Sequence, residues 1–373
     1  MASMKLRVAV LFGGRSGEHE VSLASARSVI AALDPAKYEI IPVGITPEGR
    51  WFTSGDPLET LAGGEEPNIE ELTLIPGDPS TKGLLTLGGL DHKPTTVTID
   101  VVFPVLHGPY GEDGTVQGLL ELAGLPYVGG GVTASAAGMD KAVMKACFAA
   151  AGLPQLPFRE FKRKRWEAEG KAVLDEVEAG FTYPVFVKPT NLGSSVGVSK
   201  AKDRAGLERA LDVAAMYDRK IIVEQGIECR ELECSVLGND EPIASVVGEV
   251  ITDREFYDYE AKYLPGGCEL IIPAEIDEAV AETVREYALW GFRAVDCAGL
   301  ARVDMLMERA TGQVYVNEIN TIPGFTATSA YPKLFEATGV GYAELVDRLI
   351  ELALERHEDK ARSKTTFRPG EDV

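Results

Sequence analysis

The chain has 373 residues, which is more than one hydrophobic core usually holds, and this length predicts two or three domains. Its formal net charge of −21 disfavours general binding to nucleic acid or to an anionic membrane, because attraction to those partners comes from Lys and Arg patches. The acidic balance does not exclude a small phosphate ligand, which a few local basic residues and a metal ion can hold.

Two further features of the sequence concern location and redox state. No apolar run approaches the roughly 20 residues that span a bilayer, and MASMKLRVAV lacks the apolar core and cleavage site of a secretory signal. We therefore expect a soluble protein in the cytoplasm. The five cysteines form no CxxC pair and are odd in number, so we expect reduced thiols rather than disulfides or structural zinc.

The N-terminal part of the chain predicts alternating strands and helices. LRVAVLF is a short apolar run that ends in two glycines, as expected for a buried strand that feeds a tight turn. The apolar positions that follow keep helical spacing, and Ser16 or Ser22 could cap the helix. Segments 38–45 and 100–108 predict further buried strands. This order predicts a parallel, doubly wound, Rossmann-like domain over residues 1–138.

Changes in composition along the rest of the chain indicate where its domains begin and end. Residues 53–98 are rich in Gly, Pro, Thr and acidic residues with weak periodicity, so we expect a variable excursion without assigned chemistry. A helical segment, SAAGMDKAVMKACFAAAG, marks a domain boundary near Met139. We predict a central domain at 139–225 and a C-terminal domain at 226–356. The polar residues 357–373 predict a mobile tail.

A glycine-rich loop, NLGSSVGV at 191–198, follows the apolar strand VFVK. Its glycines and hydroxyls could place backbone amides around a phosphate, but it matches neither common phosphate-loop motif and could also be an ordinary hairpin turn. Lys188 lies in the apolar strand and needs an anionic partner, for which a phosphate is suitable. Lys141 could serve likewise, or could be a solvated residue near a helix start.

The segment IIVEQGIECRE could bind an adenosine. Glu224 could hydrogen-bond an adenine amine through its backbone and side chain, and Ile227 could pack on the ring. Glu231 could meet a ribose hydroxyl if the chain turns back. The alternative is a strand that simply ends at Gly226, and only geometry decides between the two.

The segment ARVDMLMERATGQVYVNEIN predicts a hairpin with polar side chains on one face. In a strand, alternate side chains share a face, so Arg302 projects with Asp304. By the same rule Val316 projects with Glu318 and Asn320. Two carboxylates and an amide thereby fall on one side of the hairpin.

The register of this hairpin follows from its turn. A turn centred on Thr311 would set Asp304 opposite Glu318, and the same register would set Arg302 opposite Asn320. Magnesium prefers oxygen ligands and commonly takes one or two protein carboxylates. The pattern therefore predicts a magnesium site, and its alternative is an exposed polar sheet face.

Together these segments resemble the ATP-grasp superfamily and, more closely, the D-alanine–D-alanine ligase family of bacterial wall synthesis. The resemblance spans nearly the whole chain and keeps the family's order. It implies an α/β (α+β) fold of three-domain ATP-grasp architecture, ATP as substrate, Mg²⁺ that Mn²⁺ could replace, and a homodimer. It rests on GGRSGEHEVSLASA, LHGPYGEDGTVQGLLELAGLPYVG, MDK, VFVKPTNLGSSVGVSK, EFYDYEAKY, GLARVDMLM and NEINTIPGFTATSAYP.

The resemblance also implies which residues bind the metal and the nucleotide. Asp304, Glu318 and Asn320 match the family's magnesium ligands, with Glu318 bridging a pair of ions. Gln225 departs from the lysine that many relatives place there, so the adenine contact can differ in detail. The remaining matches are Lys141, Lys188 and Lys262 for the phosphates, the backbone around Ser195 for the covering loop, and Glu224, Ile227 and Glu231 for adenine and ribose.

For the amino-acid substrates, the resemblance implies a second group of residues. Glu20 matches the glutamate that pairs with the ammonium of the first D-alanine. His107 lies in the substrate loop, although without the family it could equally be a turn residue. The others are Arg302 and the Gly324 amide at the oxyanion, Ser329 at the second carboxylate, and Ser194 and Tyr263 as partners that link Glu20 to the closing loop.

The implied reaction starts when the carboxylate of one D-alanine attacks the γ-phosphorus of ATP and forms an acyl phosphate. The amine of a second D-alanine then attacks the carbonyl, and Arg302 with backbone amides stabilises the oxyanion. EFYDYEAKYLPGG at 255–267 predicts a lid that excludes water, and its alternative is an aromatic-rich surface loop.

Other functions are weighed against this one. A D-alanine–D-lactate ligase uses the same activation with an alcohol as second nucleophile, and other ATP-grasp ligases use other carboxylates. A catalytically silent nucleotide-binding regulator would lose metal or oxyanion residues, whereas this chain keeps both sets. A Rossmann dehydrogenase is disfavoured because GGRSGEHE lacks the GxGxxG spacing.

Overall fold

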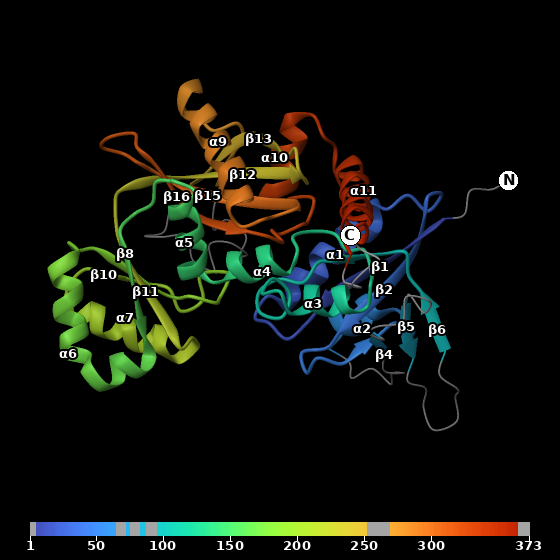
Figure 1. Ribbon diagram of the computed structural model, residues 1–373, viewed down its shortest axis with the longest axis horizontal. Coiled ribbons are helices and arrows are strands. Elements are labelled where there is room, and N and C mark those ends of the chain that lie inside the picture. The colour runs from blue at the N-terminus through green and yellow to red at the C-terminus, as the bar shows by residue number, and fades with distance from the viewer. Residues whose placement is uncertain (1–4, 65–71, 75–82, 87–94, 252–268, 365–373) are drawn as a thin grey trace, which may run out of the picture.

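The computed structural model describes the chain in five ranges and contains four β-sheets (Figure 1). The described ranges are 5–64, 72–74, 83–86, 95–251 and 269–364. Among the described residues, no helix has the length and apolar character that crossing a bilayer requires. The cysteines that the structure describes are all free thiols, as predicted for them, while Cys268 lies outside the described residues.

The first sheet has the strand order β3-β2-β1-β7, with β1, β2 and β7 parallel. This confirms the parallel unit that the sequence predicts. The alternating residues of β1 enter two cores: Val8, Val10 and Phe12 face one, and Ala9 and Leu11 face the other. Burial of both faces explains why this strand is continuously apolar. The strands are β1 (Leu6–Gly13), β2 (Tyr38–Ile45), β3 (Trp51–Phe52) and β7 (Val101–Pro104).

Short helices and a small antiparallel sheet complete the N-terminal part. Neither Ser16 nor Ser22 caps α1, because the helix begins at His19 and no side chain caps it. Part of the predicted excursion at 53–98 forms regular structure, namely α2 and the sheet β4-β5-β6. The elements are α1 (His19–Ala32), α2 (Pro57–Ala62), β4 (Leu72–Leu74), β5 (Gly83–Thr86), β6 (Thr95–Thr98) and α3 (Thr115–Leu122).

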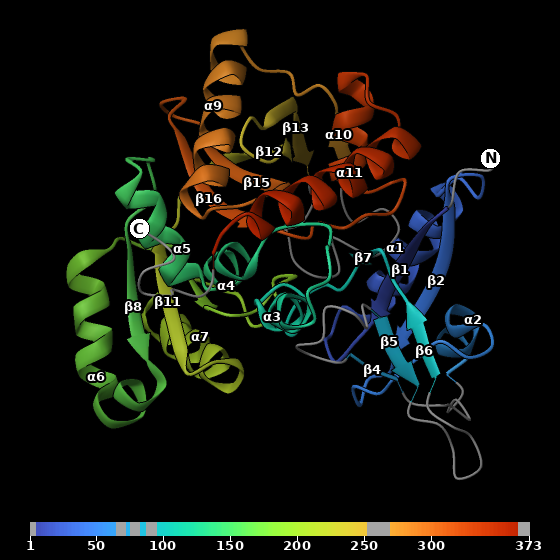
Figure 2. The same ribbon diagram turned by 45° about the vertical axis from the view of Figure 1, so that its right-hand side comes forward.

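The second sheet is antiparallel with the strand order β10-β9-β11-β8, and α6 and α7 pack against it. In Figures 1 and 2 this green and yellow-green part lies at one end of the molecule. The elements are β8 (Phe158–Lys162), α6 (Arg163–Gly180), β9 (Val185–Pro189), β10 (Ser199–Ala201), α7 (Arg204–Tyr217) and β11 (Lys220–Gln225).

The third sheet is antiparallel with the strand order β14-β13-β12-β15-β16. Apolar residues of β12, β15 and β16 pack against α9 and α5 in one core. The elements are β12 (Cys229–Gly238), β13 (Ile243–Ile251), β14 (Glu269–Ile271), α9 (Glu278–Ala294), β15 (Gly299–Glu308), β16 (Val314–Asn320) and α10 (Ala330–Thr338).

The helical segment at the predicted boundary near Met139 is two helices rather than one. α4 (Val132–Met139) ends where Asp140 adopts an extended conformation, and α5 (Lys141–Ala150) begins at the next residue. The Asp140 carboxylate accepts hydrogen bonds from the amides of Ala142 and Val143, so it caps α5. This cap makes Lys141 the first residue of a helix.

The last helix, α11 (Tyr342–Ala361), joins the first and third sheets (Figure 2). Its residues Leu345, Leu349 and Ile350 enter the same core as α1 and β1. The predicted tail at 357–373 therefore starts too early, because α11 continues to Ala361 and Lys360 lies 2.7 Å from Glu121. A polar composition does not stop a helix whose last turn finds a charged partner.

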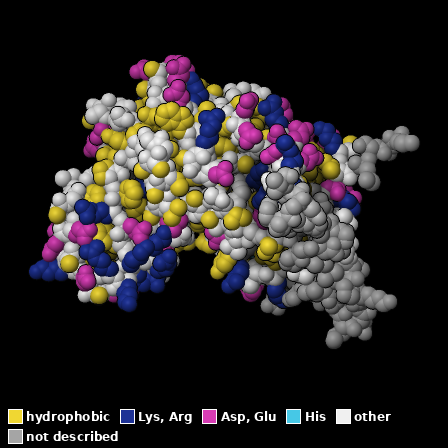
Figure 3. Space-filling view, in the orientation of Figure 1, with side chains coloured by type: hydrophobic (Ala, Val, Ile, Leu, Met, Phe, Trp, Pro, Cys, Tyr) yellow, Lys and Arg dark blue, Asp and Glu magenta, His cyan; other side chains and the backbone are white. Residues whose placement is uncertain are grey.

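The charge of the surface is unevenly distributed. Figure 3 shows Lys and Arg side chains gathered at the end of the molecule that carries α6 and α7, while Asp and Glu side chains are spread over the rest of this face. Several of the arginines there form ion pairs with acidic neighbours, such as Arg204 with Asp175 and Arg165 with Glu176. These pairs offset part of the positive charge at this end.

Candidate active site

A cavity of about 690 Å³ lies between the second and third sheets. Its lining comes from β9, the loop 190–198, the connection between β11 and β12, and the facing strands β15 and β16. Ser194, predicted as a partner in the substrate site, lines it. So do many of the residues predicted for nucleotide and metal: Lys141, Lys188, Ser195, Glu224, Ile227, Glu231, Asp304, Glu318 and Asn320.

The hairpin of β15 and β16 has the predicted register at the site. Asp304 pairs with Glu318, and Arg302 pairs with Asn320. A β-bulge then shifts the pairing by one residue, so that Met305 faces Val316. The predicted parity of Val316 is therefore wrong, because the bulge turns this side chain into the core beside Met305.

The polar face of this hairpin holds its side chains close together. The Arg302 guanidinium donates to both carboxylate oxygens of Asp304, at 2.6 and 2.7 Å. The side-chain amide of Asn320 donates to the same carboxylate at 2.9 Å. Arg302 also lies 3.3 Å from Glu233, a buried carboxylate of β12 that no sequence pattern marks. The oxyanion candidate Arg302 thus adjoins the metal candidates.

The donor chemistry of this face fits a hard divalent cation. Asp304 and Glu318 supply carboxylates, Asn320 supplies an amide oxygen, and magnesium commonly takes one or two protein carboxylates with water and phosphate oxygens completing its shell. Among the residues that the structure describes, no three His, Cys, Asp or Glu side chains gather as a metal site. The predicted set has two carboxylates and an amide, and it stays a prediction.

The phosphate candidate Lys188 has an anionic partner within the protein. Its ammonium contacts the buried carboxylate of Glu224, which also lies 2.7 Å from Lys145. Burial alone would raise the pKa of Glu224, but the two lysines outweigh it and lower the pKa to about 2. Burial would lower the pKa of Lys188, but Glu224 and Glu318 outweigh it and raise the pKa. Lys145, which sequence reasoning missed, is therefore part of the site's charge balance.

Lys141 bridges two parts of the site. Its ammonium donates to the backbone oxygen of Leu192 at 2.9 Å and lies 3.6 Å from Glu318. The glycine-rich loop that contains Leu192 turns through two residues with positive φ, 48° at Ser194 and 57° at Ser195. Non-glycine residues seldom adopt this conformation, and it is commonly found at functional loops.

The acidic residue at the start of α1 that meets this loop is Glu18. The Ser194 hydroxyl donates to the Glu18 carboxylate, which is buried, whereas Glu20 is exposed on the first turn of α1. The predicted link between Ser194 and Glu20 is therefore wrong. The helix begins one residue after Glu18, so a shift of two residues turns the side chain away from the loop.

Local contacts explain why Glu18 faces inward. Gly13 has a φ of +88°, and a Cβ on it would lie 2.3 Å from the oxygen of Ile45, so the turn after β1 requires glycine. The Ser16 hydroxyl then donates to the oxygen of His107 at 2.6 Å and accepts from the amide of Glu18 at 3.2 Å. These bonds hold Glu18 against the 106–114 loop.

His107 and Glu112 both hydrogen-bond to the backbone of Ile322, in the loop that carries Gly324. The His107 Nδ1–H donates to the oxygen of Ile322 at 3.0 Å, and the Ile322 amide donates to the Glu112 carboxylate at 3.2 Å. Glu112 also accepts from the Gly108 amide at 2.6 Å. Burial and the nearby Glu18 raise the pKa of Glu112 to about 8. Sequence reasoning missed Glu112 because its partner is distant in the chain.

The other nitrogen of His107 is also used within the protein. The Ser25 hydroxyl lies 3.1 Å from Nε2 and accepts a hydrogen bond from the Phe325 amide at 3.3 Å. Burial lowers the pKa of His107, which favours the neutral ring that this arrangement needs. The substrate contact predicted for His107 stays a prediction, and the structure gives its ring a role in joining two loops.

Gly324 and Ser329 lie together, and Ser329 precedes α10. A Cβ on Gly324 would lie 3.2 Å from the Ser329 hydroxyl, so the loop brings the backbone of Gly324 close to this hydroxyl. The Ser329 hydroxyl also accepts from the Thr326 amide at 3.1 Å.

Gln225, the departure at the adenine site, donates its side-chain amide to the oxygen of Thr182. Lys262 and Tyr263 lie outside the described residues.

The fold and these contacts define a three-domain ATP-grasp protein, and family comparisons agree. The family described as D-ala D-ala ligase N-terminus matches residues 7–130, and the one described as D-ala D-ala ligase C-terminus matches residues 147–351. The chain therefore belongs to the D-alanine–D-alanine ligase family.

Individual relatives match almost end to end. The chain is 53% identical to a D-alanine–D-alanine ligase of Heliobacterium modesticaldum, over 98% of this chain and 99% of the relative. It is 51% identical to one of Geobacillus thermodenitrificans, over 98% of this chain and all of the relative.

Solved structures agree with this assignment. The VanG D-Ala:D-Ser ligase of Enterococcus faecalis superposes with a TM-score of 0.83 at 37% identity, covering 94% of this chain and all of that one. The D-alanine–D-alanine ligase of Coxiella burnetii superposes with a TM-score of 0.81 at 36% identity, covering 96% of each chain.

Proposed function

We propose that this protein joins two D-alanine molecules to D-alanyl-D-alanine with ATP, releases ADP and phosphate, and thereby supplies a peptidoglycan precursor. The supporting comparison is the near-complete match to D-alanine–D-alanine ligases. The observation that carries the proposal is the pairing of Asp304 with Glu318 and of Arg302 with Asn320 on one face of the hairpin. Asp304, Glu318 and Asn320 line the cavity. A catalytically silent nucleotide binder has no need of that complete face.

The nucleotide and the metal belong on the strand side of the cavity in this proposal. Lys141 and Lys188 bind phosphate oxygens, while Glu224, Ile227 and Glu231 surround adenine and ribose. The predicted magnesium ligands would hold the metal, which shields the charge of the transferring phosphoryl group when bound. Glu224 already neutralises Lys188, so the lysine stays charged in a buried place before nucleotide arrives.

The first step is activation of a carboxylate. The ammonium of the first D-alanine pairs with Glu18, the residue that takes the place predicted for Glu20. A carboxylate oxygen then forms a bond to the γ-phosphorus as the bond to the leaving ADP oxygen breaks. The product is D-alanyl phosphate, which has a good leaving group at its carbonyl carbon.

The second step forms the peptide bond. The free amine of the second D-alanine attacks that carbonyl carbon, and negative charge develops on the carbonyl oxygen. Arg302 and the Gly324 amide stabilise the oxyanion, and Ser329 binds the second carboxylate. Phosphate then leaves and the amine nitrogen loses its proton. Lys262 at a phosphate and Tyr263 on the closing lid keep their predicted roles as expectations.

The identity of the second substrate is the part of the proposal that most needs measurement. We would measure phosphate release with ATP and magnesium from D-alanine alone, from L-alanine alone, and from D-alanine with D-serine or D-lactate, and identify products by mass. We expect D-alanyl-D-alanine as the main product and none from L-alanine. A depsipeptide or a serine-containing dipeptide as the main product would contradict the proposed second substrate, and no product would contradict the ligase function.

The cellular setting is proposed on the same basis. ATP and the growing peptidoglycan precursor meet in the bacterial cytoplasm, so we place the reaction there. The homodimer is an expectation from the family, and sedimentation of the purified protein would test it.

A further inference from the structure

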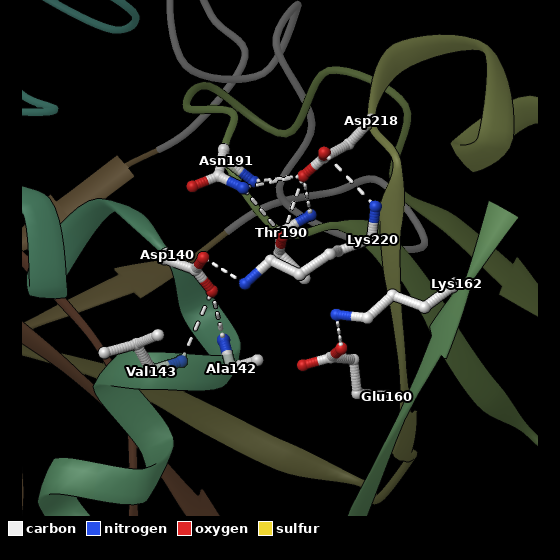
Figure 4. A network of polar contacts seen from close by, with 9 residues as sticks. All are labelled: Asp140, Ala142, Val143, Glu160, Lys162, Thr190, Asn191, Asp218 and Lys220. Atoms are coloured by element: carbon white, nitrogen blue, oxygen red, sulfur yellow. Dashed lines mark hydrogen bonds and ion pairs between the residues drawn. The ribbon is translucent and has the colours of Figure 1, made fainter.

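A buried ion pair outside the cavity joins the helix that carries Lys141 to the strand that carries Glu224. Lys220 is the first residue of β11, and its ammonium contacts the carboxylate of Asp140 (Figure 4). The two side chains are only 8% and 14% exposed, and neither residue lines the cavity. The pair therefore lies behind the site, where it cannot touch a nucleotide directly.

The two oxygens of the Asp140 carboxylate make different contacts. One oxygen accepts from the amides of Ala142 and Val143 and caps α5, while the other meets Lys220. The next residue is Lys141, so the direction in which α5 starts decides where the Lys141 ammonium lies. An ion pair at the cap fixes that direction.

A second carboxylate, that of Asp218, binds Thr190 and Asn191 at the start of the glycine-rich loop, which we call the loop root. Asp218 accepts from the amide and hydroxyl of Thr190 at 3.1 and 2.7 Å, and from the amide and side-chain nitrogen of Asn191, both at 2.9 Å. Burial would raise the pKa of Asp218, but these hydrogen bonds outweigh it and lower the pKa, so the group is ionised. Figure 4 shows the four bonds converging on one end of Asp218.

Backbone hydrogen bonds close the network. The Thr190 amide also donates to the oxygen of Lys220 at 3.2 Å, and the Lys141 amide donates to the oxygen of Thr190 at 3.0 Å. The loop root, the start of α5 and the start of β11 are thus tied to one another. At the far end, the Lys141 ammonium reaches the oxygen of Leu192 in the same loop.

Stability alone does not explain the pair. Removing two charges from water offsets most of the attraction that a buried ion pair gains, so a well-packed apolar pair is often as stable. An ion pair forms only when its two charged groups are in contact, however, so it favours one arrangement of the segments that carry them. Here those segments carry a proposed phosphate ligand and the loop proposed to cover the phosphates.

We propose that Asp140, Lys220 and Asp218 form a positioning network that holds Lys141 and the glycine-rich loop in the arrangement that binds the nucleotide phosphates. The inference rests on the proposed function, because it acts through the phosphate role of Lys141. None of the three side chains touches substrate.

The test compares Lys220→Met with a control on the neighbouring strand. Lys162 pairs with Lys220 across β8 and β11, but its side chain is half exposed and contacts only Glu160 in Figure 4. We expect Lys220→Met to raise the dissociation constant for ATP, measured by calorimetry without D-alanine, about tenfold. Lys162→Met should change it less than about twofold, and the KM for D-alanine should stay within about twofold in both variants. Equal effects of the two substitutions would overturn the proposal.

A double variant separates positioning from general destabilisation. Because part of the loss passes through Lys141, Lys220→Met should raise the dissociation constant less in a Lys141→Met background than in the wild type. Fully additive losses would overturn the network. Asp140→Asn keeps an oxygen that caps α5 but removes the charge, so it should weaken ATP binding as Lys220→Met does. This variant replaces Lys220→Met in the test if Lys220→Met fails to fold. Lys220→Arg should restore part of the affinity.

Failure of the network and failure of the proposed function give different results. A wild-type protein that forms no D-alanyl-D-alanine contradicts the proposed function. A wild-type protein that forms the dipeptide but shows additive losses contradicts only the network. Unchanged ATP affinity in Lys141→Met alone contradicts the phosphate role of Lys141 and with it this inference.

Discussion

Two groups of residues build the site in different ways. The strand group, Arg302, Asp304, Glu318 and Asn320, lies on paired strands and is fixed by their register. The loop group, Glu18, His107, Glu112, Ser194 and Gly324, is assembled from loops that meet across the chain, as when His107 bonds Ile322. The difference teaches that local pattern can fix part of a site, while the remainder exists only after the domains have packed.

The strand group makes the largest prediction. Glu318→Gln should reduce ATP-dependent phosphate release by about 1,000-fold or more, because loss of several kcal/mol of charge stabilisation equals roughly three powers of ten in rate. Folding should be nearly intact, as checked by circular dichroism. Glu308→Gln is the control, since Glu308 lies at the end of the neighbouring strand β15 but does not line the cavity. Retained turnover in a folded Glu318→Gln variant would remove the metal assignment.

The buried charges beside the strand group make the next prediction. Glu224→Gln should lower the free energy of unfolding at pH 7 by about 3–5 kcal/mol, because it leaves Lys145 and Lys188 buried without their carboxylate. Urea denaturation measures this, with Glu176→Gln as control, because the Glu176 side chain is 30% exposed and its partners lie at the surface.

The pH dependence of this effect has a definite sign. The pKa of Glu224 is lowered from 4.5 to about 2, so its stabilisation is present above pH 4.5 and is lost as the pH falls towards 2. The difference between the wild type and Glu224→Gln should therefore shrink across that window. A difference that grows as the pH falls would contradict the assigned charge state.

The loop group is tested by a pair of neighbouring carboxylates. Glu18→Gln should reduce kcat/KM for D-alanine about 100-fold, because breaking a buried charge pair with the substrate ammonium costs about 2–5 kcal/mol. Glu20→Gln should stay within about twofold, since Glu20 is exposed. Steady-state kinetics of both variants decides between them, and a larger loss for Glu20→Gln would restore the original assignment.

The last prediction concerns Glu112. Its pKa is raised from 4.5 to about 8, so the folded protein binds a proton there more tightly than the unfolded chain does. Stability from this group is therefore full below pH 4.5 and is lost as the pH rises towards 8. Glu112→Gln should remove that slope, and thermal unfolding between pH 5 and pH 8 measures it. An unchanged slope would mean that Glu112 is already ionised.

The register of the hairpin was predictable because the direction of the side chains along a strand repeats every second residue. Arg302 and Asp304 needed only that period and a turn near Thr311. The bulge that turns Val316 into the core was missed, although the sequence marks it. Val316 and Ile319 are buried but differ in parity, because two polar residues lie between them. Packing against Met305 decides where it falls.

The choice between Glu18 and Glu20 shows a different limit. Both residues lie in GGRSGEHE, and the resemblance alone placed the role at Glu20. The side chain that meets Ser194 is decided by where α1 begins and by Ser16, which accepts from the Glu18 amide and donates to His107, 91 residues away in the chain. No spacing within the motif carries that information.

By itself, the sequence determined the family, the parallel first sheet and the polar face of the hairpin, because motifs and strand periods are short-range properties of the chain. Only the tertiary structure decided that Glu224 is held between Lys145 and Lys188, that Glu18 meets Ser194, and that Asp140 meets Lys220. The physical reason is that a buried charge takes its partner from whichever segment packs beside it, and the partner's distance along the chain leaves no local pattern.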